Sequence, residues 1–278
     1  MRTGMAALAV LVATSAAQAQ APPRLRWQAG QVLVYRAEHN TYASETAGDG
    51  KSETKSRLVV TKRWQVLGVD AAGVATLQFS LTGLLSEITR PNGEVLRFDS
   101  AAPDKSTPAL REQCQQYVGA PLAVIRVDGQ GKVLEVKEAR PGFGSPAKYE
   151  NDPPFKVWLP ATALAPGASW ERPYQLTLEP PLGTGEKYEA AQRFTCKAIQ
   201  GGLATLAMTT AVKAPPAAAA DQVPVWQNQP EGEVVFDLNA GRMKSVLLQI
   251  NKEAKGQQGD NSSTLFRSTY KEEYVGDR

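Results

Sequence analysis

The sequence has 278 residues and a formal net charge of +3, with 31 Lys and Arg, 28 Asp and Glu, one His and two Cys. Its charges are spread evenly along the chain and lack the concentrated basic face of nucleic-acid-binding proteins, so we expect no nucleic-acid partner. One histidine cannot build a histidine-rich metal site, and the sequence predicts neither a metal ion nor another cofactor.

The first 19 residues have the features of a secretory signal peptide. Arg2 supplies a positive start, residues 5–13 form a short apolar stretch, and residues 17–19 (AQA) have the small-x-small form that signal peptidase reads. We therefore predict cleavage between Ala19 and Gln20. No segment approaches the roughly 20 apolar residues that cross a membrane as a helix, and no cysteine follows the cleavage site to carry a lipid. The sequence predicts a free exported protein, periplasmic or extracellular, without a transmembrane segment.

Beyond the signal peptide, short runs rich in Val, Leu, Thr and aromatic residues alternate with a period of two and are separated by Gly, Asn and Asp. This pattern predicts strands joined by tight turns, and such turns join antiparallel neighbours. We therefore expect an all-β fold of mainly antiparallel strands, barrel-like or sandwich-like, with residues 42–53 as a polar hairpin tip. The predicted strands are Gln31–Tyr42, Thr54–Val69, Val74–Thr89, Glu94–Asp99, Leu122–Asp128, Lys132–Glu138, Ser169–Leu178, Lys187–Ile199, Leu203–Val212, Glu233–Leu238, Arg242–Lys252 and Ser263–Tyr274.

One helix is predicted at residues 108–118. Thr107 is the expected N-cap, Pro108 occupies the first helical position, and Gly119 can end the helix in the left-handed region. We expect its apolar stripe to lie on the sheet or to close the open end of a barrel.

Two sequence echoes predict an internal repeat. Residues 73–77 (GVATL) return as 202–206 (GLATL), and residues 93–99 (GEVLRFD) return as 232–237 (GEVVFD). They indicate two related β units, residues 24–105 and 160–275, joined by a helix, a hairpin and a connector in residues 106–159. Similar composition of hairpin strands is the alternative explanation. A Pro- and Ala-rich loop at residues 214–224 and the stretch 140–154 are expected to lack strands, the first as a flexible excursion.

The two cysteines, Cys114 and Cys196, lie 82 positions apart and are both expected to point inward. An oxidising compartment would allow them to pair, and in the loop-entropy model such a bridge would stabilise the protein by about 4 to 5 kcal/mol. Two separate buried thiols that pack as small hydrophobic groups are the alternative.

The sequence predicts no catalytic residue and no enzymatic activity. His39, the only histidine, continues the apolar face of the first predicted strand and is interpreted as a packed or rim residue, although a Ser-His-Asp triad would have to use it. Carboxylates that could pair as acid and base cannot be placed by sequence. They are Glu87, Asp99, Glu150, Asp152 and Glu179.

Aromatic residues offer the remaining signal for a binding site, although no ligand-binding residue can be assigned. Trp64 and Trp170 lie within predicted strands, where core packing is expected. Trp158 and Trp226 lie beside proline-rich loops, where a rim or ligand-facing position is more plausible.

Several short motifs resemble those of one known family. They are residues 25–27 (LRW) with Gly30 and Tyr35, residues 119–122 (GAPL) before 128–133 (DGQGKV), and residues 166–170 (PGASW). The chain resembles, over nearly all of its mature length, an exported bacterial family known only as a domain of unknown function, number 6263. The resemblance implies a secreted β-rich protein and carries no activity, ligand or catalytic residue.

The leading functional hypothesis is non-catalytic binding of an apolar or peptide-like ligand in the cell envelope. Long alternating strands, a capping helix and the missing catalytic sets favour it. The alternative is an envelope scaffold that binds a protein partner through exposed strand edges or the Pro-rich loop. A hydrolase built on carboxylates is the third hypothesis.

Overall fold

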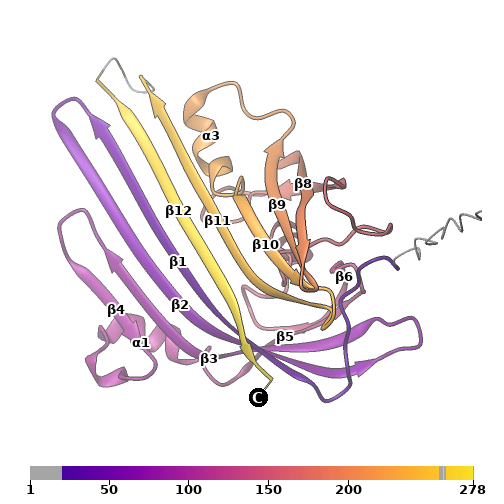
Figure 1. The fold of residues 1–278 in the computed structure, drawn as a ribbon. Helices are drawn as coiled ribbons and strands as arrows, with labels where there is room; N and C mark the ends of the chain where they lie inside the picture. Colours follow the sequence, from indigo (N-terminus) through magenta and orange to yellow (C-terminus); the bar gives the residue numbers. More distant parts are fainter. Residues whose placement is uncertain (1–20, 257–258, 260, 278) are drawn as a thin grey trace, which may run out of the picture.

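The computed structural model describes residues 21–256, 259 and 261–277, so the predicted signal peptide and its cleavage site at Ala19 and Gln20 lie outside it. The described residues form one 12-stranded sheet, ordered β6-β5-β3-β2-β1-β12-β11-β10-β9-β8-β7 with β4 paired to β3 (Figure 1). The strands are β1 (Val32–Ala47), β2 (Gly50–Val69), β3 (Ala75–Thr89), β4 (Val95–Asp99), β5 (Pro121–Val127), β6 (Val133–Ala139), β7 (Ser169–Thr177), β8 (Lys187–Gln200), β9 (Leu203–Val212), β10 (Glu231–Asp237), β11 (Arg242–Lys255) and β12 (Ser263–Gly276).

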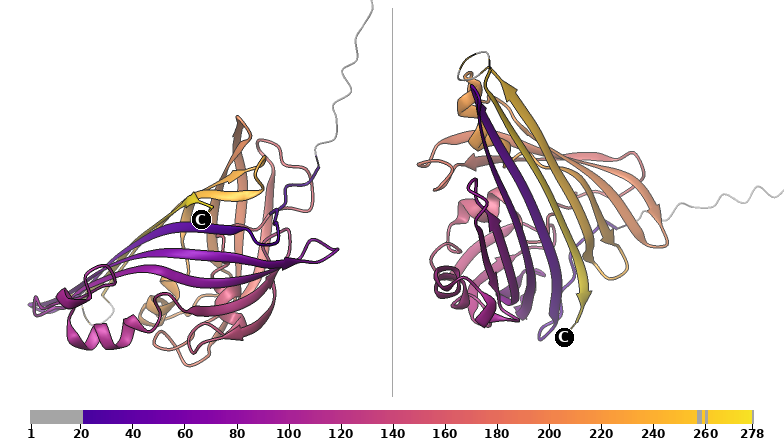
Figure 2. Two further views of the ribbon diagram at one scale, coloured as in Figure 1. Left: turned by 90° about the horizontal axis from the view of Figure 1, so that it is seen from below. Right: turned by 90° about the vertical axis from the view of Figure 1, so that its left-hand side faces the viewer.

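The sheet is antiparallel between all of its paired strands, which confirms the predicted fold class. It is strongly curved, as Figure 2 shows from two further sides, and its two ends share one core. Ile125 of β5 belongs to the same buried cluster as Phe194 of β8 and Leu206 of β9. The sheet nevertheless does not close into a barrel, because its terminal strands β6 and β7 do not pair with each other.

The predicted hairpin is present, but its tip is shorter than the predicted residues 42–53. Strands β1 and β2 pair without interruption from Val32 opposite Gln65 to Ala47 opposite Gly50, and only residues 48–49 form the turn. Polar residues dominate this end of the hairpin because much of it is exposed on both faces, so the alternation of apolar and polar residues that marks a half-buried strand is absent.

The predicted helix is present as α1 (Pro108–Gln115), three residues shorter than expected, and Gly119 follows it with a φ of +81°. Thr107 does not cap it through its side chain; instead its Oγ1 accepts a hydrogen bond from the Arg97 backbone N–H at 3.0 Å. The helix lies beside β4, and none of its residues is fully buried, so it does not plug the core.

Two stretches that the sequence analysis assigned to irregular chain contain helices. The first holds α2 (Pro146–Asn151), where the Ser145 side chain caps the helix by accepting from the Lys148 N–H. The second holds α3 (Ala219–Trp226) with Pro224 inside it, so these residues are not an extended loop. Trp226 of α3 is buried against Ile250 and Phe266, and this packing supplies a stability that local composition does not indicate. A short 3-10 turn, η1 (Pro103–Lys105), precedes α1.

Residues 140–168, hereafter the seam segment, lie between the two terminal strands of the sheet. On one side the Leu159 N–H donates to the Gln130 carbonyl in the β5–β6 turn at 2.9 Å. On the other side the Asn151 side chain donates to the Thr177 carbonyl at 2.8 Å and accepts from the Thr177 N–H at 3.2 Å. The side chain of Asn151 thus satisfies backbone groups at the end of β7 that have no neighbouring strand.

The seam segment is anchored in the core by Phe155, which is 1% exposed. Its ring centroid lies 5.3 Å from that of Trp27, 6.0 Å from that of Tyr35 and 5.4 Å from that of Trp64. Such aromatic contacts stabilise the fold by more than the burial of apolar area alone. The curved sheet therefore encloses a core to which the connector between its halves contributes.

The two echoed motifs occupy corresponding places in two four-stranded meanders, β1–β4 and β7–β10. Residues 73–77 lead into β3 and residues 202–206 into β9, while residues 93–99 include β4 and residues 232–237 lie in β10. Strands β1 and β12 join the two predicted units in one sheet. The relatedness of the units stays a prediction.

Both cysteines are free in this structure. Cys114 lies half-buried on α1, and Cys196 is fully buried on β8. The arrangement is therefore that of two separate thiols.

Replacing Phe155 by Ala is expected to lower the free energy of unfolding by about 3–5 kcal/mol, because it removes a buried ring and leaves a cavity. Equilibrium unfolding in urea measures the change. The matched control Leu134→Ala on β6, where Leu134 is 46% exposed, should change stability by less than about 0.5 kcal/mol. Equal losses in the two variants would contradict the anchoring role of Phe155.

Candidate functional site

A cavity of about 420 Å³ lies between the inner face of the sheet and the seam segment. Apolar and aromatic side chains make up most of its wall, and three lysines reach it. The lining residues are Ala37, His39, Leu58, Val60, Lys62, Trp64, Phe79, Leu81, Leu84, Tyr117, Phe143, Lys148, Tyr149, Asp152, Pro153, Pro154, Lys156 and Tyr270.

Strand register brings the sheet side of this wall together. Ala37 of β1 lies opposite Val60 of β2, and Val60 lies opposite Leu84 of β3. A bulge then shifts the β2–β3 register, so that Leu81 lies opposite Lys62. The bulge allows both Leu81 and Leu84 to face the cavity, although strict alternation would place them on opposite faces.

The polar part of the cavity is centred on Tyr270 of β12. The Lys62 Nζ donates to the Tyr270 hydroxyl at 2.7 Å and forms an ion pair with Glu272 Oε1 at 3.0 Å. The Tyr270 hydroxyl in turn donates to the other carboxylate oxygen of Glu272. Glu272 is fully buried, and its charge is therefore balanced by one lysine and one hydroxyl.

Lys156 approaches the same tyrosine from the seam segment. Its Nζ lies 4.6 Å from the centroid of the Tyr270 ring and also contacts the carboxylate of Asp152, which is 61% exposed. Lys156 is the one non-glycine residue with a positive φ among the described residues, at +53°, a conformation that costs about 1–3 kcal/mol. The backbone thus adopts an unfavourable conformation where it presents this ammonium group.

Lys148 of α2 supplies the third ammonium group. Its Nζ donates to the Gly142 carbonyl at 2.8 Å and lies 4.5 Å from the centroid of the Phe143 ring. Among the described residues, no carboxylate lies within ion-pair distance of Lys148. A carbonyl and a ring face are weaker counterparts for a cation than a carboxylate.

Burial and mutual repulsion shift the protonation of this cluster. Burial, with the nearby charge of Lys62, lowers the pKa of Lys156 to about 7, and it lowers the pKa of Lys148 as well. Burial beside Glu272 raises the pKa of Tyr270 well above its ordinary value. The ammonium groups of Lys148 and Lys156 are therefore held in an environment that disfavours their charge.

His39 lies where this cavity meets a second cavity of about 250 Å³. Its Nε2 forms a hydrogen bond with Ser268 Oγ at 2.7 Å, and its ring packs edge-on against Tyr270. Burial and the charges of Lys156 and Lys62 lower the pKa of His39. Among the described residues no carboxylate is hydrogen-bonded to this ring, so the structure places His39 as a packed wall residue and forms no Ser-His-Asp triad there.

The five candidate carboxylates do not converge on one cleft. Glu87 and Asp99 both bind Arg97, at 2.8 and 3.0 Å. Only Asp152 borders the cavity. Glu150 borders a separate space of about 380 Å³, and Glu179 lies just after β7.

The two tryptophans expected near a ligand do not line the 420 Å³ cavity. The centroid of the Trp158 ring lies 5.3 Å from Cζ of Arg172, and Trp158 borders the 380 Å³ space beneath α2. Trp226, at the end of α3, is buried against the sheet. Trp64 is buried in the core, as expected, and also lines the cavity. Its indole Nε1–H is buried and has no hydrogen-bond partner among the described residues.

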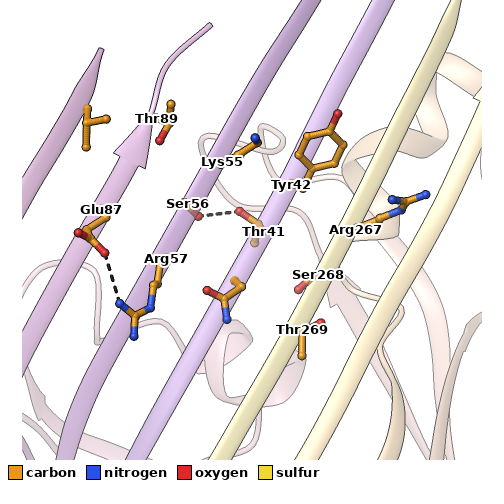
Figure 3. A pocket seen from close by; sticks show the side chains of 12 residues that line it. Thr41, Tyr42, Lys55, Ser56, Arg57, Glu87, Thr89, Arg267, Ser268 and Thr269 are labelled. Atoms are coloured by element: carbon orange, nitrogen blue, oxygen red, sulfur yellow. Dashed lines mark hydrogen bonds and ion pairs between the residues drawn. The ribbon is translucent and has the colours of Figure 1, made fainter. Parts of the chain in front are cut away.

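A larger hollow of about 530 Å³ lies open on the distal parts of β1, β2, β3 and β12 (Figure 3). Several of its polar side chains are already paired: Arg57 binds Glu38 at 2.9 Å and Glu87 at 3.5 Å, and Thr41 Oγ1 lies 2.6 Å from Ser56 Oγ. Because these groups satisfy one another in a solvent-exposed setting, we assign the candidate site to the more apolar 420 Å³ cavity.

Within residues 21–256, 259 and 261–277, no three His, Cys, Asp or Glu side chains gather in a way that could hold a metal ion. The same part of the chain contains no helix long and apolar enough to cross a membrane.

The free energy of unfolding is expected to rise between pH 7 and pH 10. In this range the unfolded chain keeps a proton on Lys156 that the native protein releases, because the native pKa is about 7 and the ordinary value is 10.5. One such proton contributes at most about 1.4 kcal/mol per pH unit.

In the Lys156→Met variant, the free energy of unfolding should rise less between pH 7 and pH 10. Lys148, whose pKa is also lowered, should contribute part of the rise that remains. Urea unfolding at several pH values measures it. Lys244→Met, at an exposed position on β11, is the matched control and should keep the rise. An unchanged pH slope in Lys156→Met would show that Lys156 is charged in the native protein throughout this range.

Comparison with known proteins reveals similarity of fold only. No protein-family model and no curated protein matches the sequence, so the resemblance to the family of unknown function stays a prediction. A solved structure of lipovitellin, described for its lipid–protein interactions, is similar to 91% of this chain with a TM-score of 0.52 and 12% identity, and the match spans 26% of the lipovitellin chain. The structure of DynF from the dynemicin biosynthesis pathway of Micromonospora chersina aligns with 96% of this chain and 94% of its own, at 8% identity and a TM-score of only 0.20. The lipovitellin similarity indicates a shared curved-sheet architecture.

Proposed function

We propose that the protein binds an apolar or amphipathic small molecule in the cavity between the sheet and the seam segment, without converting it chemically. The observation that carries this proposal is a half-open cavity of about 420 Å³ walled mainly by apolar and aromatic side chains. Ligand sites in proteins commonly occupy about 300–1,000 Å³ and combine an apolar lining with few polar groups.

The energetics of such a site favour an apolar occupant. Moving apolar surface from water into the cavity is favourable by about 25 cal/mol per Å². A ligand would also gain dispersion contacts with Phe79, Leu81 and Leu84 that an empty space lacks.

The structural similarity to lipovitellin supports the proposal by analogy, since that structure was described for its contacts with lipid. Together with the predicted signal peptide, the proposal describes an exported carrier or binding protein of the cell envelope.

The scaffold alternative gains no specific support from the structure. It relied on exposed strand edges and on the Pro- and Ala-rich loop. At the end of β7, the backbone groups are instead hydrogen-bonded to the Asn151 side chain. Part of the loop forms α3, which packs on the sheet.

Filling the cavity is expected to abolish ligand binding. Val60→Trp places a bulky ring between β1, β3 and the seam segment, whereas Leu247→Trp adds the same ring to the outer face of β11, where Leu247 is 45% exposed. Fluorescence titration with the neutral apolar dye Nile red should give an affinity at least about tenfold weaker for Val60→Trp, with Leu247→Trp unchanged.

Native mass spectrometry of the purified mature protein provides an independent measurement, as a co-purified apolar molecule should be lost in Val60→Trp. If wild-type protein neither takes up Nile red nor carries a ligand, the proposed function is wrong. Circular dichroism of each variant establishes that the sheet is intact.

A further inference from the structure

We propose that the ligand is an amphiphile with a single anionic head group, and that Lys148 and Lys156, beside Lys62, hold this head group while its apolar chain fills the cavity. This inference rests on the proposed function and adds the chemical class of the ligand. The three lysines line the same cavity but come from β2, α2 and the turn after α2.

The charges around the cavity are unequal. Three ammonium groups line it, whereas the carboxylates that pair with them are those of Glu272 and Asp152. The cluster therefore carries a surplus of one positive charge when all three lysines are protonated. One anionic group would balance this surplus, and buried charges in proteins are generally paired.

The two carboxylates differ in how well they neutralise their partners. Glu272 is fully buried and compensates Lys62 at 3.0 Å. Asp152 is 61% exposed, so water screens its attraction for Lys156. Lys148 has the Gly142 carbonyl and the Phe143 ring as close counterparts, and the charge of Glu179 acts on it only from beyond ion-pair distance. The surplus positive charge thus belongs to Lys148 and Lys156 rather than to Lys62.

Burial is the first cause of the lowered pKa values of Lys148 and Lys156, and the carboxylates near them do not offset it. An anion bound between them would supply the missing counter-charge in a setting of low polarity, where such pairing is stronger than in water. A neutral or cationic head group would supply no counter-charge to these ammonium groups.

The cavity wall offers charged groups for a head group and apolar surface for a chain. Lys62 and Lys156 both approach Tyr270, at the boundary with the second cavity. Leu81, Leu84 and Phe79 form the apolar wall on β3. A ligand with a charged end and an apolar tail would satisfy both regions, whereas a small anion would use only the first.

Displacement of Nile red from the wild-type protein at neutral pH tests the inference with four compounds used below their micellar concentrations. Dodecanoate, dodecanol and dodecyltrimethylammonium share a chain and differ in head-group charge, and acetate has the carboxylate without the chain. We expect dodecanoate to displace the dye at concentrations at least about tenfold lower than dodecanol. Dodecyltrimethylammonium should be weaker than dodecanol, and acetate should have no effect.

The Lys148→Met/Lys156→Met double variant keeps the length and apolar stem of both side chains and should bind Nile red. In this variant the preference for dodecanoate over dodecanol should disappear, whereas Lys244→Met on the outer face of β11 should retain it. A preference that persists in the double variant would overturn the role of these lysines.

Measurements on the wild-type protein alone can refute each part of the proposal. Equal displacement by dodecanoate and dodecanol would refute the anionic head group and leave apolar binding intact. Displacement by acetate as effective as that by dodecanoate would refute the amphiphile. Failure of Nile red itself to bind would instead refute the proposed function.

Discussion

The packing of Phe155 among the rings of Trp27, Tyr35 and Trp64 is the interaction on which the other features of this fold depend. An open sheet with this curvature would leave its inner face exposed to water between β6 and β7. Phe155 holds the seam segment inside the curve, and the chain on either side of it then forms one wall of the cavity. Lys156 is the next residue, so the same anchor fixes the position of its ammonium group beside Tyr270.

Much of the sheet could be predicted from sequence because burial on one face produces alternation. Strand β9 was predicted with the observed bounds, Leu203–Val212, since its buried residues alternate between a glycine turn and a stretch rich in proline and alanine. The end of the β1–β2 hairpin was missed because neither of its faces is well buried, which removes the alternation. Helices α2 and α3 were missed for a different reason: they are short, contain proline, and depend on tertiary contacts such as those of Trp226.

The candidate site was harder to predict than the fold, because its residues meet only through long-range packing. One local signal was present: Lys62 lies in the apolar phase of β2, between Val60 and Trp64, where a charge requires a buried partner. Glu272, in phase with Tyr270 on β12, offers that partner, yet more than 200 positions separate the two charges. Sequence periodicity places each residue on an inward face and does not reveal that β12 lies beside β1.

The pairing of β1 with β12 has a consequence for the order in which the molecule can be completed. Strand β1 lies near the start of the described chain, but its second neighbour is formed by residues 263–276 (Figure 1). Until these residues have been synthesised, β1 is an unpaired edge more than ten residues long, able to pair with strands of other molecules. The ion pair between Lys62 and Glu272 spans β1 and cannot form earlier either. Contacts of such large sequence separation slow folding, so this edge stays open to pairing for most of the synthesis of the chain.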